Sequence, residues 1–130
     1  MAQTTSQKLG IHAETIAVVL GCPVEEVREL LGEVPDGAAV VADATSADLV
    51  LLFVDDVAEV TGSARSAYER VRDGGRLWIA YRKGASRRSS AGAEPLHRDT
   101  LQAALAALGL DGVALISLDE TWSAMRVKAV

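Results

Sequence analysis

Two short segments, residues 48–54 and 76–81, constrain the fold of this chain more than any other feature, because each is an uninterrupted apolar run after one charged residue. Short runs without polar alternation are typical of strands buried on both faces of a parallel sheet. Parallel strands need a crossover connection, and the residues between these runs show a helical pattern over 63–72. Two consecutive glycines precede the second run. This part of the chain therefore predicts a strand, a helix, a turn and a second parallel strand.

The same patterns predict the remaining elements and their arrangement. Further strands are expected at 15–20, 38–42, 113–118 and 122–127, and further helices at 23–31 and 97–108. The last two strands are separated by so short a link that they must form an antiparallel hairpin. The order of elements predicts an α/β fold, an open, mainly parallel, three-layer Rossmann-like sheet of about six strands with one antiparallel edge strand.

Length and composition limit the organisation of the chain. A chain of 130 residues suits one domain, and we expect a flexible tail at 1–8 and a single domain at 9–130. The single cysteine, Cys22, excludes an internal disulfide. Neither a basic, apolar start nor an apolar segment of roughly 20 residues occurs, so we expect a cytoplasmic location without a membrane partner.

Charge is distributed unevenly along the chain. Residues 1–64 hold 11 acids against two bases, a net charge of −9, whereas residues 65–130 hold 11 bases against seven acids, a net of +4. The overall charge of −5 argues against a nucleic-acid partner, because Lys and Arg supply most non-specific affinity for phosphates. The second half can still form a local basic patch.

The predicted layout resembles a known enzyme fold. The strand Ala47-Asp-Leu-Val-Leu-Leu-Phe-Val54, the turn Val71-Arg-Asp-Gly-Gly-Arg76 and the strand Leu77-Trp-Ile-Ala-Tyr81 resemble the corresponding part of S-adenosylmethionine-dependent methyltransferases. A helix ending in Leu108-Gly-Leu110 and a terminal hairpin extend the resemblance over roughly residues 15–130. The resemblance implies a methyltransferase-like fold.

Relative to that family, one strand and helix pair is missing between Asp43 and Asp48. More closely, Trp78-Ile-Ala-Tyr-Arg-Lys83 together with Asp119-Glu-Thr-Trp-Ser-Ala-Met-Arg126 resembles a bacterial family of small domains of unknown function. This second resemblance implies a truncated fold of the same kind, and it implies no activity.

The loop after the first strand departs from the methyltransferase pattern. Those enzymes usually carry several glycines there, so that the backbone approaches the cofactor closely, whereas this chain has only Gly21. Pro23 lacks an N–H donor, and Glu25 and Glu26 place negative charge where a helix N-terminus would attract an anion. The loop therefore argues against S-adenosylmethionine and against a dinucleotide cofactor.

Four residues are the candidate contacts if S-adenosylmethionine binds nevertheless: Gly21, Asp43, Asp55 and Asp56. Asp43 lies close to the spacing of about 20 residues at which an acid holds a ribose in dinucleotide folds. Asp55 and Asp56 follow a strand at the end of the sheet where α/β proteins bind ligands. The alternative for all three aspartates is a structural cap, which we favour.

The loop that follows the strand at 76–81 is the stronger candidate for a binding site. It concentrates positive charge and hydroxyl groups, and its candidate ligand-binding residues are Arg82, Lys83, Ser86, Arg87 and Arg88. A solvated loop without a ligand is the equally weighted alternative. Cys22 is expected to be an inert thiol because Glu25 and Glu26 oppose a thiolate, and no metal site is expected.

Three functional hypotheses remain. The preferred one is a non-catalytic binding module on a degenerate methyltransferase-like scaffold, without a cofactor, which binds a partner protein or a small anionic ligand near residues 82–90. The first alternative is a divergent S-adenosylmethionine-dependent methyltransferase. The second is an oligomeric structural protein, in which another subunit covers the edge strand at 38–42.

Overall fold

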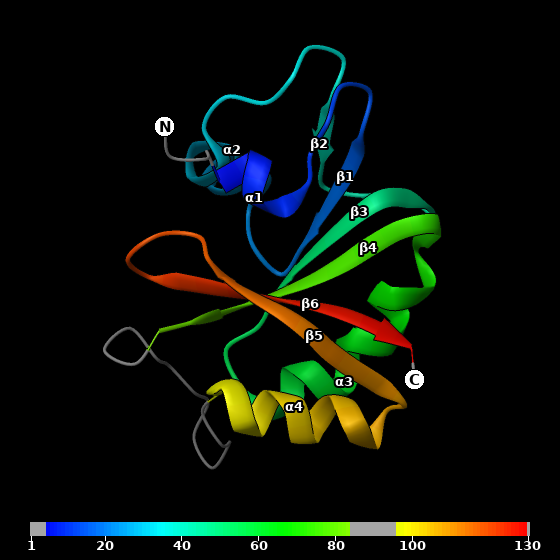
Figure 1. The fold of residues 1–130 in the computed structure, drawn as a ribbon, viewed down its shortest axis with the longest axis vertical. Helices are drawn as coiled ribbons and strands as arrows, with labels where there is room; N and C mark the ends of the chain where they lie inside the picture. Colours follow the sequence, from blue (N-terminus) through cyan, green and yellow to red (C-terminus); the bar gives the residue numbers. More distant parts are fainter. Residues whose placement is uncertain (1–4, 84–95, 130) are drawn as a thin grey trace.

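The computed structural model describes residues 5–83 and 96–129, which form one six-stranded sheet with helices on both faces (Figure 1). The strands are β1 (Ile16–Leu20), β2 (Ala39–Val41), β3 (Ala47–Phe53), β4 (Val71–Arg82), β5 (Leu110–Ser117) and β6 (Trp122–Ala129). The helices are α1 (Thr5–Leu9), α2 (Val24–Leu31), α3 (Val57–Glu69) and α4 (Arg98–Ala107). The strand order is β2-β1-β3-β4-β6-β5, with the first four strands parallel. The expected open α/β sheet is confirmed.

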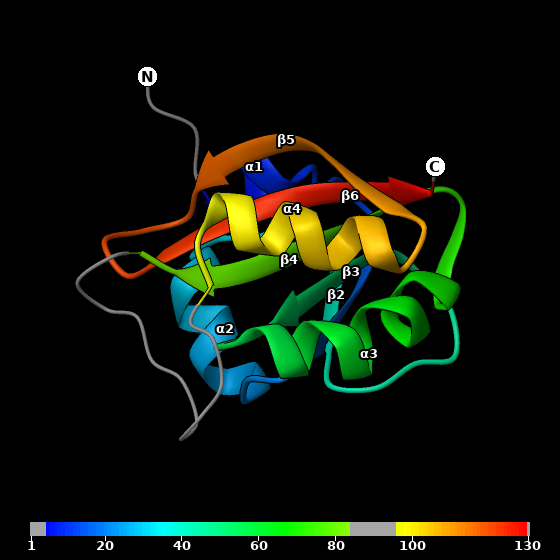
Figure 2. The same ribbon diagram turned by 90° about the horizontal axis from the view of Figure 1, so that it is seen from below.

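The antiparallel strand lies inside the sheet, and not at its edge as expected. β6 pairs antiparallel with β4, with Leu77 opposite Val127, and antiparallel with β5, with Leu115 opposite Met125. The predicted hairpin is thus confirmed, but its first strand, β5, forms the edge. Helix α4 packs beside α3 and leads into β5, so the first strand of the hairpin lies outside and the second returns next to β4 (Figure 2).

Each face of the sheet carries its own apolar core. Helices α3 and α4 contribute residues such as Ala64 and Leu105 to one core, and α1 and α2 contribute residues such as Leu9 and Val27 to the other. Trp78 is buried in the second core, where its indole N–H donates to the carbonyl oxygen of Leu9 at 2.9 Å. These cores give the expected three layers, with the alternating side chains of β1, β3 and β4 pointing into both.

The prediction of a flexible tail at 1–8 is wrong for residues 5–8. Thr5–Leu9 forms helix α1, and the Ser6 hydroxyl is buried and donates to the carbonyl oxygen of Glu33 at 2.7 Å. Leu9 and Ile11 are buried against α2 and the sheet, and they anchor this segment although its own pattern is polar. Residues 1–4 lie outside the described part of the chain.

Helix α3 begins at Val57, six residues before the predicted start at 63. The Asp56 carboxylate accepts a hydrogen bond from the Glu59 N–H at 3.0 Å and so forms the N-terminal cap. Gly62 lies inside the helix, and a Cβ added there would meet no atom within 4 Å. The cap therefore defines the start of the helix, and the glycine does not interrupt it.

Strand β4 begins at Val71 and contains the predicted double-glycine turn as an irregularity. The pairing of β3 with β4 shifts register between Ala47 and Leu49, opposite Val71 and Arg76. Gly74 has a φ of +81°, a conformation that other L-residues rarely adopt. The glycines thus bend the start of the strand before its regular part.

Only residues 42–46 connect β2 to the parallel strand β3, and they contain neither helix nor strand. Parallel strands are normally joined by a crossover of a dozen or more residues. Here the link passes β1, which lies between β2 and β3, and it runs back by only three positions, because Val41 at the end of β2 is level with Val18 of β1 and Val50 of β3, and β3 starts at Ala47. This agrees with the expected loss of a strand and helix pair.

The edge at β2, which an oligomeric protein was expected to cover, is already partly closed. The Ala39 N–H donates to the carbonyl oxygen of Thr15, which directly precedes β1. The backbone groups of the next residue, Val40, therefore point away from β1. The Arg28 guanidinium donates to the Val40 carbonyl oxygen at 2.8 Å. A three-residue strand with a capped carbonyl offers little for strand addition.

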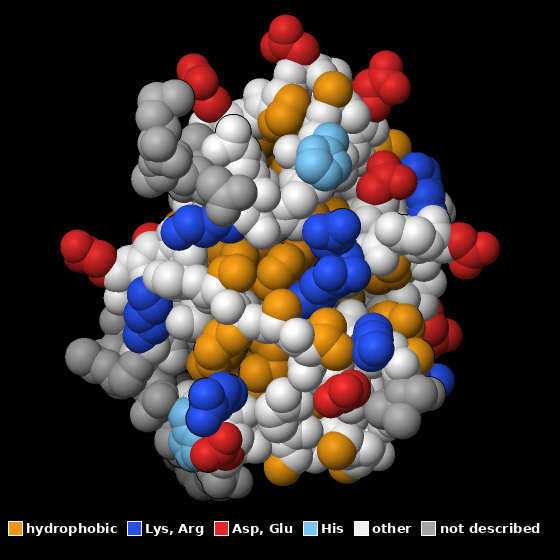
Figure 3. Space-filling view, viewed as in Figure 1, with side chains coloured by type: hydrophobic (Ala, Val, Ile, Leu, Met, Phe, Trp, Pro, Cys, Tyr) orange, Lys and Arg blue, Asp and Glu red, His pale blue; other side chains and the backbone are white. Residues whose placement is uncertain are grey.

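Charge is segregated in space as well as in sequence. In Figure 3, acidic side chains project from the upper end of the molecule, where Figure 1 places α2 and β2. The Lys and Arg side chains of this face lie mainly over its middle and lower parts.

Among the described helices, none is long and apolar enough to cross a membrane.

Candidate functional site

A pocket of about 540 Å³ lies at the carboxyl ends of β1, β3 and β4. Gly21 follows β1, Asp55 follows β3, Arg82 ends β4 and Trp122 begins β6, and all four line it. The chain leaves β1 towards β2 on one side and returns as β3 on the other side. The pocket therefore lies at the point of the sheet where open α/β folds bind ligands. We call it the acidic pocket because acidic side chains dominate its lining.

Gly21 is required by the packing of the sheet. Its φ is +83°, and a Cβ at this position would collide with the carbonyl oxygen of Phe53. The glycine thus allows the end of β1 to approach the end of β3 closely. Pro23 follows at the N-terminal cap of α2, where no side chain accepts a hydrogen bond from the helix. This loop is compact, in contrast to the glycine-rich cradle of the resembled family.

Acidic side chains dominate the pocket lining. Glu26 and Glu29 come from α2, Asp55 follows β3 and Asp119 precedes β6. Among the described residues, the Arg82 guanidinium is the single positive charge that lines the pocket with these four carboxylates. Within the described residues, only Asp55 of these four acids forms an ion pair. The lining thus favours a positively charged group over an anion.

Asp55 and Arg82 form an ion pair in the pocket. Arg82 Nε lies 2.8 Å from Asp55 Oδ1, with side-chain exposures of 20% and 34%. The guanidinium carbon lies 4.4 Å from the centre of the Trp122 ring, and the Phe53 ring meets Trp122 edge-on with 4.9 Å between centroids. The cation therefore rests between a carboxylate and an aromatic face.

The four candidate cofactor contacts separate in the structure. Gly21 and Asp55 line the acidic pocket together, whereas Asp56 is buried as the cap of α3. Asp43 pairs with Arg70 at 3.0 Å, is 87% exposed and does not line the acidic pocket. The capping alternative therefore holds for Asp56 but not for Asp55, whose carboxylate faces Arg82.

Cys22 lines the pocket as a protonated thiol. Burial, the hydrogen bond from its Sγ to Glu26 Oε2 at 3.6 Å and the negative charge of Glu26 together raise the pKa of Cys22 to about 11. A thiol with so high a pKa is a poor nucleophile at neutral pH. This agrees with the expectation of an inert cysteine.

The predicted basic loop lies only partly within the described residues. Ser86, Arg87 and Arg88 lie outside them. Lys83 donates from its backbone N–H to the Thr121 carbonyl oxygen at 2.8 Å, and its ammonium group donates to the Ser117 hydroxyl. Anion binding by this loop stays a prediction.

In the described part of the chain, no group of three His, Cys, Asp or Glu side chains is arranged to hold a metal ion.

Sequence reasoning missed Glu29, Asp119 and Trp122 as pocket residues. Glu26 was considered only as a group that repels anions, although the same charge attracts cations. Glu26 and Glu29 are three residues apart and share one face of α2, a spacing that could have indicated a common site. Trp122 and Asp119 reach the pocket only through the inward position of β6, which the sequence did not reveal.

Comparison with known proteins shows the fold. No family model and no curated protein matches the chain. Solved structures do match it. The match to the pyocyanin biosynthetic protein PhzM has a TM-score of 0.66 and 11% identity, and it covers 96% of this chain and 53% of PhzM. The match to the O-methyltransferase NcsB1 from neocarzinostatin biosynthesis, in complex with S-adenosylmethionine and 2-hydroxy-5-methyl naphthoic acid, has a TM-score of 0.65 and 14% identity, and it covers 99% of this chain and 51% of NcsB1. The complex of DhpI with S-adenosylhomocysteine also matches (TM-score 0.58, 12% identity, 88% and 76%).

The chain thus has a methyltransferase-like Rossmann fold, and it spans about half the length of PhzM and of NcsB1. The residues present do not fit S-adenosylmethionine well. The acid after β2, Asp43, is turned towards Arg70 and lies outside the pocket, and the compact turn at Gly21 replaces a glycine-rich cradle. The acidic lining, in contrast, suits a positively charged group.

Proposed function

We propose that this protein is a non-catalytic binding module on a methyltransferase-like scaffold, and that the acidic pocket binds a small ligand with a positively charged group. One observation carries the proposal: within the described part of the chain, four carboxylates and a single guanidinium line a pocket at the carboxyl ends of β1, β3 and β4. A positively charged ligand would relieve the repulsion among the acids. An anionic ligand remains a prediction for the loop at 82–90 and not for this pocket.

The chemistry of the lining supports binding without catalysis. The high pKa of Cys22 keeps it a thiol, and Asp55 is engaged by Arg82 at 2.8 Å. Neither His12 nor His97 lines the pocket. A general base or nucleophile must be free and close to its target. Cys22 and Asp55 therefore do not meet the first of these conditions.

Calorimetry with pairs of charged and neutral ligands of the same shape tests this proposal. Choline is compared with 3,3-dimethylbutanol, in which carbon replaces the charged nitrogen. We expect choline to bind and its neutral counterpart to bind at least about tenfold more weakly. Glu26→Gln should weaken choline binding, whereas Glu33→Gln, at an exposed residue outside the pocket, should not. Equal binding of the two ligands would contradict the proposal.

A divergent methyltransferase is the second candidate. It is favoured by the position of the pocket at the switch point of the sheet, together with neighbours whose structures hold S-adenosylmethionine or S-adenosylhomocysteine. These two molecules differ by one methyl group and by the positive charge on sulfur. Calorimetry with both decides between the candidates. Tight binding of both would support the enzyme, and no heat from either would exclude it.

A further inference from the structure

The most completely built part of the acidic pocket is already occupied by a side chain of the protein itself. Arg82 leaves the end of β4 and turns its guanidinium between Asp55 and Trp122. Phe53 supports the Trp122 ring from its edge, at 4.9 Å between centroids. We call Asp55, Trp122 and Phe53 the cation subsite.

We infer that the cation subsite is the place where the ligand's positive group binds, and that Arg82 is an internal competitor that must leave first. This inference rests on the proposed function, and it adds both the position of the charged group and the means by which binding is restrained. A carboxylate beside an aromatic face is the chemistry that holds guanidinium and alkylammonium groups. The ligand class is therefore a guanidinium or alkylammonium compound.

Exchange of the Arg82 guanidinium for the positive group of a ligand leaves the charge balance at Asp55 unchanged. Asp55 keeps one positive partner whether Arg82 or a ligand occupies the subsite, so its carboxylate is never left uncompensated. Arg82 is 20% exposed at the rim, and its long, flexible side chain can move its charge into solvent. The other three acids, Glu26, Glu29 and Asp119, then face the ligand without an internal cation beside them.

A structural role is the competing explanation, because the ion pair also ties the end of β3 to the end of β4. The two explanations predict opposite effects of removing the guanidinium. A structural tie predicts a less stable protein with unchanged or weaker ligand binding. An internal competitor predicts tighter binding, since the ligand no longer has to displace anything.

The test measures binding of methylguanidinium, which copies the Arg82 head group, to wild-type protein and to Arg82→Gln. Methylurea, which has the same shape without the charge, is the control ligand. We expect Arg82→Gln to bind methylguanidinium about tenfold more tightly than the wild type and to bind methylurea no better. Equal or weaker binding of methylguanidinium by folded Arg82→Gln overturns the inference.

Further variants keep the test decisive. Trp122→Leu, combined with Arg82→Gln, should abolish the gain, and a gain that persists without the ring places the ligand elsewhere. If Arg82→Gln does not fold, Arg82→Lys replaces it, because its compact ammonium lacks the flat guanidinium that lies against the ring. Tighter methylguanidinium binding by Arg82→Lys supports the inference, and equal or weaker binding overturns it.

Failure of this inference is distinguishable from failure of the proposed function. If wild-type protein binds choline and loses it in Glu26→Gln, while Arg82→Gln shows no gain for methylguanidinium, the pocket binds cations but Arg82 does not compete. If neither protein binds either cation, both the inference and the proposed function fail.

Discussion

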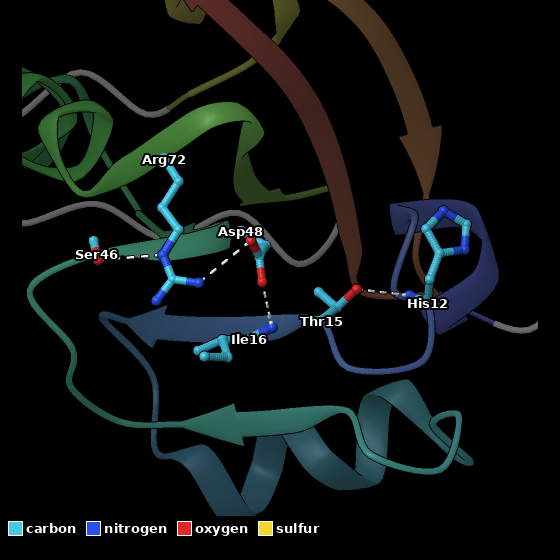
Figure 4. A network of polar contacts seen from close by, with 6 residues as sticks. All are labelled: His12, Thr15, Ile16, Ser46, Asp48 and Arg72. Atoms are coloured by element: carbon cyan, nitrogen blue, oxygen red, sulfur yellow. Dashed lines mark hydrogen bonds and ion pairs between the residues drawn. The ribbon is translucent and has the colours of Figure 1, made fainter.

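The two ends of the parallel strands use polar side chains in opposite ways. At the amino ends, the Asp48 carboxylate accepts a hydrogen bond from the Ile16 N–H at 2.9 Å and forms an ion pair with Arg72 at 3.5 Å (Figure 4). The Arg72 guanidinium also donates to the Ser46 hydroxyl at 3.3 Å. Thr15 completes this network by accepting from the His12 N–H at 3.0 Å. Each group is engaged with a neighbouring strand or loop.

At the carboxyl ends, in contrast, the acidic pocket holds three carboxylates that form no ion pair with any described residue. Self-sufficient networks hold strands in register and leave nothing for a ligand. An excess of one charge in a concave site destabilises the protein slightly and attracts the opposite charge from outside. The difference agrees with the proposal that the carboxyl ends bind a ligand, whereas the amino ends hold the strands together.

The largest expected effect is on stability at the carboxyl ends. Gly21→Ala should lower the free energy of unfolding by about 3 kcal/mol, because its φ is positive and the new Cβ collides with the Phe53 carbonyl. Gly32→Ala is the matched control, since its φ is +71° but no atom lies within 4 Å of the added Cβ. Urea denaturation should show a loss of only about 1 kcal/mol for this control. Equal losses would mean that the close approach of β1 to β3 is unimportant.

A smaller effect is expected at the amino ends. Asp48→Ala should lower the free energy of unfolding by about 1.5 kcal/mol, because the Ile16 N–H and Arg72 lose their acceptor. Binding of a cationic ligand in the acidic pocket should not change. Denaturation and calorimetry on the same variant check both statements. A marked loss of binding would break the distinction between the two ends of the sheet.

The smallest expected effect concerns Cys22. Alkylation by iodoacetamide should be slow at neutral pH and should accelerate as the pH rises towards 11, because only the thiolate reacts. Glu26→Gln removes the negative charge that helps to raise the pKa of Cys22, so alkylation at pH 9 should be faster than in the wild type.

The raised pKa of Cys22 also makes the stability of the protein depend on pH. Because folding raises the thiol pKa, the unfolded chain releases its proton first, and the free energy of unfolding should fall as the pH rises through about 11. Urea-unfolded protein, in which the thiol is free of Glu26, is the control for reactivity. A folded protein that reacts as fast as the unfolded one would contradict the burial and the contact with Glu26.

The sequence predicted the strands well because a buried parallel strand must be apolar throughout. The segment 48–54 corresponds to β3, the segment 76–81 lies in the second half of β4, and the link at 119–121 lies in the turn between β5 and β6. The start of α3 was placed too late although a capping role was favoured for Asp56, because an aspartate caps turns as well as helices. The helix at Thr5–Leu9 was missed because its stability comes from packing against α2.

The candidate site was only half predictable. The carboxyl ends of adjacent parallel strands must meet, so Gly21, Asp55 and Arg82 were expected near a ligand and do lie together. The pairing of Arg82 with Asp55 was not expected, because the basic loop was considered as one unit. The direction of the Asp43 side chain depends on Arg70, which lies 27 residues away in the sequence.

Chemical-shift mapping of the wild-type protein with choline and with 3,3-dimethylbutanol tests the central claim most directly. We predict that choline shifts the amide signals of Gly21 and Asp55 and the indole signal of Trp122, in a saturable manner, and that 3,3-dimethylbutanol does not. The signals of Ile16 and Asp48 at the opposite end of the sheet should stay in place. Equal shifts with both compounds, or no shift at the acidic pocket, would contradict the account.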